Sequence, residues 1–389
     1  MNIKFGLLPR IILAIALGVL LGSFMPEWFI RTFATFNGIF GAFLSFAIPL
    51  IIIGFITPGI AHMGKGAGKM LGLTTTTAYI STIVAGFLAF VVGSFLLPGF
   101  VKNQQLINLE NPEEFLQSGF FTIEMAPIMG VMSALIFSFI LGIGISATNG
   151  VALRNILDDF QRIIEKVITY IIIPLLPIHI LGIFMNMTYG GQVQSILVVF
   201  SKVFIVIIAL HIAMLLLQYT VAGAASGQNP FKLLRKMLPA YFTALGTQSS
   251  AATIPVTLDS AKKTGVNPKV AEFSIPLFAT IHLSGSTITL VSCAMGVMFL
   301  TGTTPAIGEL FPFILLLGVM MIAAPGVPGG AVMAALGLLE TMLGFDQTML
   351  SLMIALYLAQ DSFGTATNVT GDGALTVLVN RLTGNKMTA

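Results

Sequence analysis

The stretch DSFGTATNVTGD, residues 361–372, holds two carboxylates inside an apolar segment long enough to cross a bilayer. The spacing i, i+4, i+7, i+11 places four of its polar side chains on one helix face: Asp361, Thr365, Asn368 and Asp372. That stripe is about 16 Å long at 1.5 Å per residue. A charge at mid-bilayer costs about 2.5–3.5 kcal/mol, so intramembrane acids usually face a cavity. No basic residue lies in the span, which indicates a mobile cation as the partner; a polar seam between helices is the alternative.

Composition supports a membrane setting for this stretch. Of 389 residues, 56% are hydrophobic and 8% are charged, and the mean hydropathy is +0.98. Soluble domains carry about 25% charged residues. The lone cysteine, Cys293, excludes an intrachain disulfide and a multi-cysteine metal cluster. A net charge of +3 does not indicate nucleic-acid binding, so the expected partners are the lipid bilayer and a small-molecule substrate.

The predicted fold class is an all-α polytopic membrane protein with eight transmembrane helices and two opposed re-entrant hairpins. Apolar spans are expected near 8–30, 36–60, 72–98, 126–148, 165–185 and 196–223, with long spans also near 271–300 and 346–380. The corresponding segments are 1–71, 72–98, an external loop at 99–125, 126–190, 191–224, a first hairpin at 230–264, 268–300, a second hairpin at 306–342, and 346–381.

The basic residues predict the topology. If the N-terminus is cytoplasmic, all 18 lysines and arginines except Arg31, Lys102 and Lys202 fall on the cytoplasmic side. This distribution predicts an inner-membrane protein with both termini in the cytoplasm. It requires one hairpin to enter from the cytoplasm and the other from outside. Two ordinary spans, with a helix miscounted elsewhere, are the alternative.

The tips of both hairpins contain helix breakers. Thr247–Pro255 reads TQSSAATIP, and Ala324–Gly330 reads APGVPGG. Proline removes a backbone donor and glycine admits unusual backbone angles, so both sequences interrupt a helix. A broken helix exposes N–H groups that suit a carboxylate and carbonyls that suit a cation. For the second tip, a kink that serves packing alone is the alternative.

Two short segments resemble each other. His282-Leu283-Ser284-Gly285-Ser286 is echoed 86 residues later by Asn368-Val369-Thr370-Gly371-Asp372. Each follows a predicted hairpin, and the hairpins enter from opposite faces. This arrangement predicts an inverted repeat with a transport site at its interface. His179 and His211 are expected to be packed, hydrogen-bonded histidines. The hydroxyls of the third span, Ser81 and Thr82 included, either line the site or bond their own helix.

The sequence resembles the dicarboxylate/amino acid:cation symporter family, in its neutral amino acid branch. Three motifs carry the resemblance: the Ser-Ser tip, the Gly-Val-Pro-Gly tip and Asp361…Thr365…Asn368-Val369-Thr370-Gly371-Asp372. The resemblance covers most of the chain. It implies a homotrimer that works by an elevator movement. The scaffold would comprise 1–71 and 126–190, and the transport domain 72–98, 191–224 and the chain from 230 onward.

The resemblance also implies roles for individual residues. Asp361 would hold a substrate ammonium, Asn368 with Ser249 and Ser250 the substrate carboxylate, and Thr365 would lie beside the substrate side chain. Val327 and Gly329 would belong to an extracellular gate. Sodium, the implied coupling ion, would be held by Asp372, Asn368, His282, Ser284, Ser81 and Thr82, and by carbonyls near Thr280, Met321, Ile322 and Ala324.

Two departures from the family pattern change the expected substrate and ions. Members that carry acidic substrates have an arginine where this chain has Gly364 or Gln248, so we expect a small neutral amino acid such as serine, threonine or alanine. The family's Asn-Met-Asp-Gly-Thr is here the segment from His282 to Ser286. The missing acid predicts either fewer coupled sodium ions or a proton carried by His282.

Three other functions remain as alternatives to sodium-coupled symport. The first is a proton-coupled carrier of a neutral amino acid or a dicarboxylate. The second is an intramembrane serine hydrolase that uses Ser284 or Ser249 with His282, although two residues on one helix that are only two positions apart do not face each other. The third is a channel. A transporter that is not an enzyme is the prediction.

Overall fold

The computed structural model describes residues 7–62, 68–101, 116–191, 193–322, 324, 328–384 and 387. The first α-helices of this part are α1 (Leu7–Gly22), α2 (Glu27–His62), α3 (Gly68–Val101), α4 (Val131–Thr148), α5 (Val151–Val167), α6 (Ile173–Tyr189) and α7 (Val193–Ser226). They are followed by α8 (Pro230–Thr247), α9 (Ser250–Lys263), α10 (Pro268–Ile281), α11 (Ser284–Leu300), α12 (Ile307–Ile322), α13 (Gly330–Leu343), α14 (Gln347–Leu358) and α15 (Asp361–Leu382).

The predicted all-helical class is confirmed for the described residues. Five helical runs there are long and apolar enough to cross a membrane: Glu27–Pro58, Met70–Gly99, Val151–Tyr189, Ile196–Ser226 and Pro268–Leu300. Several other apolar helices, α14 among them, have 10–17 residues. The total of eight crossings therefore stays a prediction.

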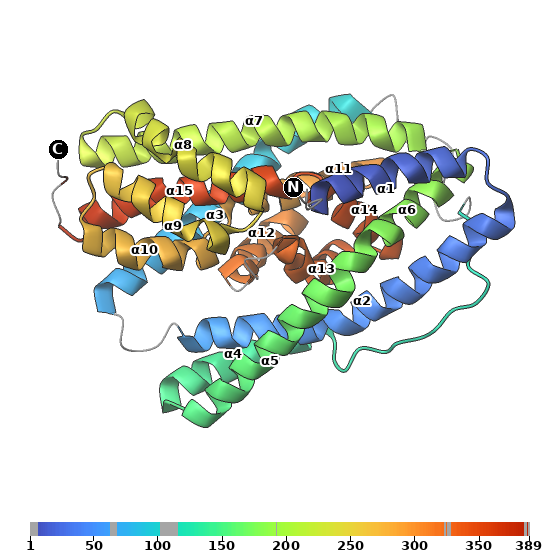
Figure 1. Cartoon of the computed structure of the whole chain (residues 1–389), viewed down its shortest axis with the longest axis horizontal. Coiled ribbons are helices and arrows are strands. Elements are labelled where there is room, and N and C mark those ends of the chain that lie inside the picture. The colour runs from blue at the N-terminus through green and yellow to red at the C-terminus, as the bar shows by residue number, and fades with distance from the viewer. Residues whose placement is uncertain are drawn as a thin grey trace, which may run out of the picture.

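The helices pack into two sets (Figure 1). In the first set, α2 contacts α4, α5 and α6, and α1 lies along α6. In the second set, α7 runs the length of the molecule against α11 and α15, and α3 packs on α11. The helices α8, α9 and α10 surround α15. The sets meet where α13 contacts α2 and α4, where α14 contacts α1 and α6, and where α12 contacts α2 and α7 contacts α6.

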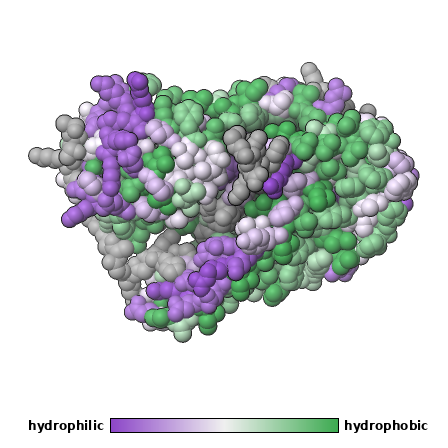
Figure 2. Space-filling view, in the orientation of Figure 1, coloured by the Kyte–Doolittle hydropathy of each residue, from purple (hydrophilic) through white to green (hydrophobic). Residues whose placement is uncertain are grey.

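Polar residues gather in two places on the face shown in Figure 2. They cover the end of the molecule that carries α8, and they follow α5 along its length. The helix α5 has a strongly charged side and a buried side that includes Leu157 and Ile164. A π-helical turn, Ile168–Ile172, joins it to the apolar α6. The predicted span near 165–185 therefore lies within a longer helical run, and an amphipathic segment precedes it.

Glycines allow α1 to lie directly on the backbone of α6. Gly18 and Gly22 form a G-x-x-x-G pattern, the spacing that brings two membrane helices close together. A Cβ added at Gly18 would lie 2.6 Å from the Leu181 carbonyl oxygen, and one at Gly22 would lie 2.4 Å from that of Met185. The contact is therefore made between backbones, with no side chain between them.

Local sequence explains where several helices begin. Asn229 precedes Pro230, and its side chain accepts hydrogen bonds from the N–H groups of residues 231 and 232 at 2.9 and 3.2 Å. Asn267 precedes Pro268 and caps α10 in the same way. Asp346 caps α14 through the Met349 N–H at 2.8 Å. A side-chain acceptor followed by proline at the first helical position is a strong start signal.

The long spans predicted near 271–300 and 346–380 each consist of two consecutive helices in the structure. The first span breaks at His282 and Leu283, between α10 and α11, and the second breaks at Ala359 and Gln360, between α14 and α15. Neither break contains glycine or proline. The first two spans also divide at 23–26 rather than at 31–35, because Pro26 ends the gap and the aromatic segment after it is helical.

The sequence similarity between 282–286 and 368–372 does not correspond to equivalent positions in the helices. The first segment begins at the α10–α11 break, whereas the second lies within α15. The two segments contact each other, because Asn368 bonds to Gly285. The inverted repeat itself stays a prediction.

Candidate functional site

Two carboxylates are buried in the described part of the chain, and both belong to α15. Asp361 is 5% exposed and Asp372 is 0% exposed, and no lysine or arginine of the described residues is buried. As predicted, α15 carries the whole stripe, and Thr365 and Asn368 are buried with the acids. Burying an unpaired charge is expensive. The stripe therefore needs partners from outside the basic side chains of the protein.

Asp361 is the first residue of α15, where the helix dipole favours a negative charge. Its Oδ2 accepts a hydrogen bond from the backbone N–H of Gly329 at 2.7 Å. Gly329 has φ +75°, a conformation that favours glycine, and stands directly before α13. The second hairpin thus reaches the carboxylate. Val327, two residues before Gly329, lies outside the described residues.

The Asn368 side chain caps the start of α11. Its Oδ1 accepts from the N–H of Gly285 at 2.7 Å and from that of Ser286 at 3.3 Å. Its Nδ2 donates to the Ser286 hydroxyl at 2.9 Å. The first N–H groups of a helix lack partners within it, so this tertiary cap explains why α11 can begin after a break without glycine or proline. The predicted role of Asn368 in substrate and sodium binding stays a prediction.

At Gly364, α15 approaches α11 closely. A Cβ added at Gly364 would lie 3.5 Å from backbone atoms of Gly285 and Ser286 and from the Thr289 hydroxyl. A Cβ at Gly285 would lie 2.4 Å from the Gly364 carbonyl oxygen. Position 364 therefore faces α11, and an arginine there would point into this packed contact.

Asp372 is paired with a histidine. The Nδ1 of His282 lies 2.8 Å from Oδ1 of Asp372, and both side chains have an exposed fraction of 0%. The other carboxylate oxygen, Oδ2, has no hydrogen-bond partner among the described residues. The structure thus brings together two predicted cation ligands, and one oxygen of the pair stays available as an acceptor.

A third helix, α7, contributes Gln218 to this cluster. Its Nε2 donates to the Ser81 hydroxyl at 2.9 Å and to the Ser284 hydroxyl at 3.2 Å, and lies 3.4 Å from Nε2 of His282. Ser81 is in turn 3.0 Å from the same imidazole nitrogen. Sequence reasoning missed Gln218. It lies seven residues after His211 on the same helix face, and polar residues in an apolar helix indicate a functional interior.

Two further α7 side chains bond to the broken helices. The Tyr219 hydroxyl donates to the Thr370 carbonyl at 2.7 Å. His211 Nε2 lies 3.0 Å from the Gly285 carbonyl and 3.2 Å from the Thr289 hydroxyl. The prediction that His211 is a packed, hydrogen-bonded histidine is confirmed. Sequence reasoning also missed Tyr219.

The first hairpin tip is a tight turn between α8 and α9. Gln248 has φ +54° and ends α8, and Ser249 caps α9 by accepting from the Ala252 N–H at 3.3 Å. The Thr253 hydroxyl donates to the Ser249 carbonyl at 2.7 Å. Ser250 begins α9 and is half-buried. The hydroxyl-rich sequence thus stabilises the turn itself.

The remaining predicted cation ligands lie at two places. Met321 and Ile322 end α12 and Ala324 follows it, so the last carbonyls of α12 are there; Thr280 is exposed near the end of α10. Helix C-termini have unpaired carbonyls that can hold a cation. Thr82 is buried beside Ser81, and its hydroxyl has no hydrogen-bond partner within the described ranges.

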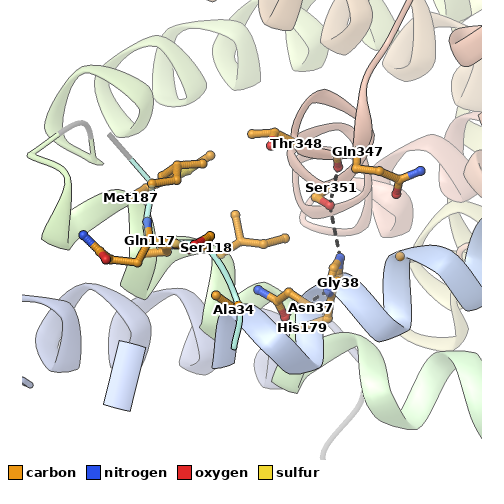
Figure 3. A pocket seen from close by; sticks show the side chains of 15 residues that line it. Ala34, Asn37, Gly38, Gln117, Ser118, His179, Met187, Gln347, Thr348 and Ser351 are labelled. Carbon is orange, nitrogen blue, oxygen red and sulfur yellow. Dashed lines mark hydrogen bonds between the residues drawn. The ribbon is translucent and has the colours of Figure 1, made fainter. Parts of the chain in front are cut away.

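A separate cavity of about 340 Å³ lies at the seam between the two helix sets (Figure 3). Its walls come from α2, residues 116–119, α6 and α14. His179 of α6 faces Ser351 of α14 there, with Nε2 3.1 Å from the hydroxyl, and its Nδ1 lies 3.1 Å from the Asn37 side chain. The predicted hydrogen bonding of His179 is confirmed. The lining of this cavity includes none of the predicted site residues.

Comparison with known proteins identifies relatives over nearly the whole chain. The model of the sodium:dicarboxylate symporter family matches residues 7–382. A serine/threonine transporter, SstT, of Enterococcus faecalis is 25% identical over 401 residues, covering 97% of this chain and 91% of the relative. SstT of Acinetobacter baumannii strain AYE is 24% identical over 400 residues, covering 97% of both chains.

Proposed function

Because this chain belongs to the sodium:dicarboxylate symporter family, we propose that it carries a small neutral amino acid of serine, threonine or alanine size together with sodium. A cation-coupled symporter in the membrane follows from the family, and the chain is not an enzyme. The substrate, the ion and the elevator mechanism are the parts that we propose.

One observation carries the substrate proposal. Asp361 is a buried carboxylate that accepts a hydrogen bond from the backbone N–H of Gly329, and no lysine or arginine of the described residues is buried with it. A charged group in this setting is stabilised by a cation brought from outside. A substrate ammonium supplies that charge and two further N–H donors. We therefore assign Asp361 to the ammonium group, beside Thr365 and the tips at Ser249, Ser250 and Gly329.

The absence of a buried lysine or arginine in the described part of the chain also favours a neutral substrate. A second substrate carboxylate would need a charge-assisted partner, for which guanidinium is the best suited. Positions 364 and 248 hold glycine and glutamine. The names of the relatives, serine/threonine transporters, agree with a small hydroxyl-bearing substrate.

The architecture supports an elevator. The two helix sets give a natural division into a scaffold (α1, α2, α4–α6) and a moving part (α3, α7–α15). The pairs α8–α9 and α12–α13 are the proposed opposed hairpins. The polar end at α8 and the charged α5 fit a cytoplasmic side that holds both termini (Figure 2). A homotrimer is part of the proposal.

Uptake into proteoliposomes tests this function. We expect labelled serine, threonine or alanine to accumulate when an inward sodium gradient is imposed, and dicarboxylates to fail to compete. Accumulation that follows a pH gradient without sodium would replace sodium by a proton, the alternative favoured by the His282–Asp372 pair. Equilibration without accumulation under either gradient would indicate a channel instead of a symporter.

Gln248→Arg is expected to create affinity for aspartate or glutamate. The guanidinium would project from the hairpin tip, and a hydrogen bond to a charged group contributes about 1.5–3 kcal/mol, which is about tenfold or more in affinity. Glutamine and arginine tolerate the φ of +54° equally, since neither is β-branched. Competition of aspartate against labelled serine measures the gain. Gln248→Met is the matched neutral control, and an equal effect of both substitutions would show that the tip does not face the substrate side chain.

A further inference from the structure

The Gln218 amide lies among three residues that the sequence predicts as sodium ligands. Its nitrogen is within 2.9 Å of the Ser81 hydroxyl, 3.2 Å of the Ser284 hydroxyl and 3.4 Å of the His282 imidazole. All four side chains are buried. The space that those ligands would share is thus occupied by a side chain of α7.

We propose that this site, formed by Ser81, His282, Ser284 and Gln218, is closed to sodium. Gln218 and His282 take the place of one coupling ion. The inference rests on the sodium coupling proposed above and limits it: fewer sodium ions move per substrate than the predicted ligand set allows. Coupling then depends on the other predicted ligands, at the end of α12 and at the second oxygen of Asp372.

The chemistry of the groups present disfavours a hard cation. Such ions are held by carboxylate, carbonyl and water oxygens, whereas imidazole suits transition metals. An amide NH₂ is a pure donor, and here it points at both hydroxyl oxygens. The charged or titratable groups that meet in the cluster are His282 and Asp372, and one oxygen of Asp372 is already held by the imidazole. No carboxylate contacts the Gln218 amide in the described residues.

Space leads to the same conclusion. The α15 backbone closes the site at Gly371, where an added Cβ would lie 2.6 Å from Oε1 of Gln218 and 3.0 Å from Cε1 of His282. The amide head group is therefore wedged between α15 and the serine hydroxyls of α3 and α11. An ion can enter only if Gln218 leaves. The Gln218 amide fills this space whether its nitrogen or its oxygen faces the serine hydroxyls.

The sodium-to-substrate flux ratio of the purified, reconstituted protein tests the closure. The double variant Gln218→Ala/Ser284→Asp removes the Gln218 amide from the site and supplies a carboxylate. We therefore expect one additional sodium ion per substrate and a steeper sodium dependence of uptake. Gln218→Ala/Ser284→Asn is the matched control, equal in size but without the charge, and should gain no ion. An aspartate variant that is folded and active but gains no sodium would overturn the proposal.

A single substitution gives an independent test if the double variant fails to fold. Gln218→Leu fills similar volume without an amide, and the ratio should keep its wild-type value whatever the rate of uptake. A ratio lowered by one would make Gln218 a sodium ligand and refute the closure. Uptake by the wild-type protein that does not depend on sodium would instead refute the proposed sodium coupling. The aspartate variant would still show whether removing the Gln218 amide opens a sodium site.

Discussion

Asp361→Asn is expected to lower the affinity for the amino acid substrate between about 30-fold and several thousand-fold. Removing one partner of a buried charge pair costs about 2–5 kcal/mol, which converts to that range. The substitution isolates the charge, because an asparagine oxygen can still accept the hydrogen bond from the Gly329 N–H. Binding of labelled serine to the purified protein in detergent measures the change.

The control is the same substitution at Asp346, which caps α14 through the Met349 N–H. Asparagine caps helices as well as aspartate does, so Asp346→Asn should keep wild-type affinity. Thermal unfolding of both variants verifies that they are folded. Wild-type affinity in a folded Asp361→Asn protein would reject the assignment of this carboxylate to the substrate ammonium.

Gly285→Ala should have the largest effect on stability. Its Cβ would lie 2.4 Å from the Gly364 carbonyl oxygen and 2.7 Å from Cβ of Thr367, and neither atom can rotate away. The helices α11 and α15 would have to separate, which also loosens the Asn368 cap at the Gly285 N–H. Overpacking of this kind costs about 1–3 kcal/mol, and occasionally more. A lower midpoint of thermal unfolding in detergent is the expected readout.

Gly364→Ala tests the same contact from the other side. The nearest atoms to its added Cβ are at 3.5 Å, an ordinary van der Waals distance. Replacing glycine by alanine within a helix gains roughly 0.5–1 kcal/mol, so this variant should be neutral or more stable. Equal losses at both positions would mean that α11 and α15 are not in the register described here.

The sequence predicts the class of fold well because composition reports the solvent around the protein. It also predicts the polar stripe of α15, since helical spacing is a local property. The breaks at 282–283 and 359–360 were not predictable in this way. Both segments lack glycine and proline. At the first break, the free N–H groups of α11 are capped by Asn368, which lies far away in the sequence.

The candidate site likewise has a part that the sequence predicts and a part that depends on contacts between helices. Asp361, Asn368 and Asp372 could be identified from intramembrane polarity, and their burial agrees with that reasoning. The partners of these residues could not be identified, because they come from other helices. Gln218 lies within a predicted apolar span and was not identified as a site residue, although its spacing of seven residues from His211 places both on one helix face. In the closure proposed above, that side chain changes which ions the cluster can hold.

The glycine contact between α1 and α6 limits where the molecule can shear. Backbone rests on backbone at Gly18 and Gly22, and in α1 these glycines are separated by Val19, Leu20 and Leu21. Displacing α6 along α1 by a fraction of a turn would press those bulky residues against its carbonyls. The glycine contact therefore opposes sliding between α1 and α6, and in the proposed elevator movement these two helices would stay together within the scaffold.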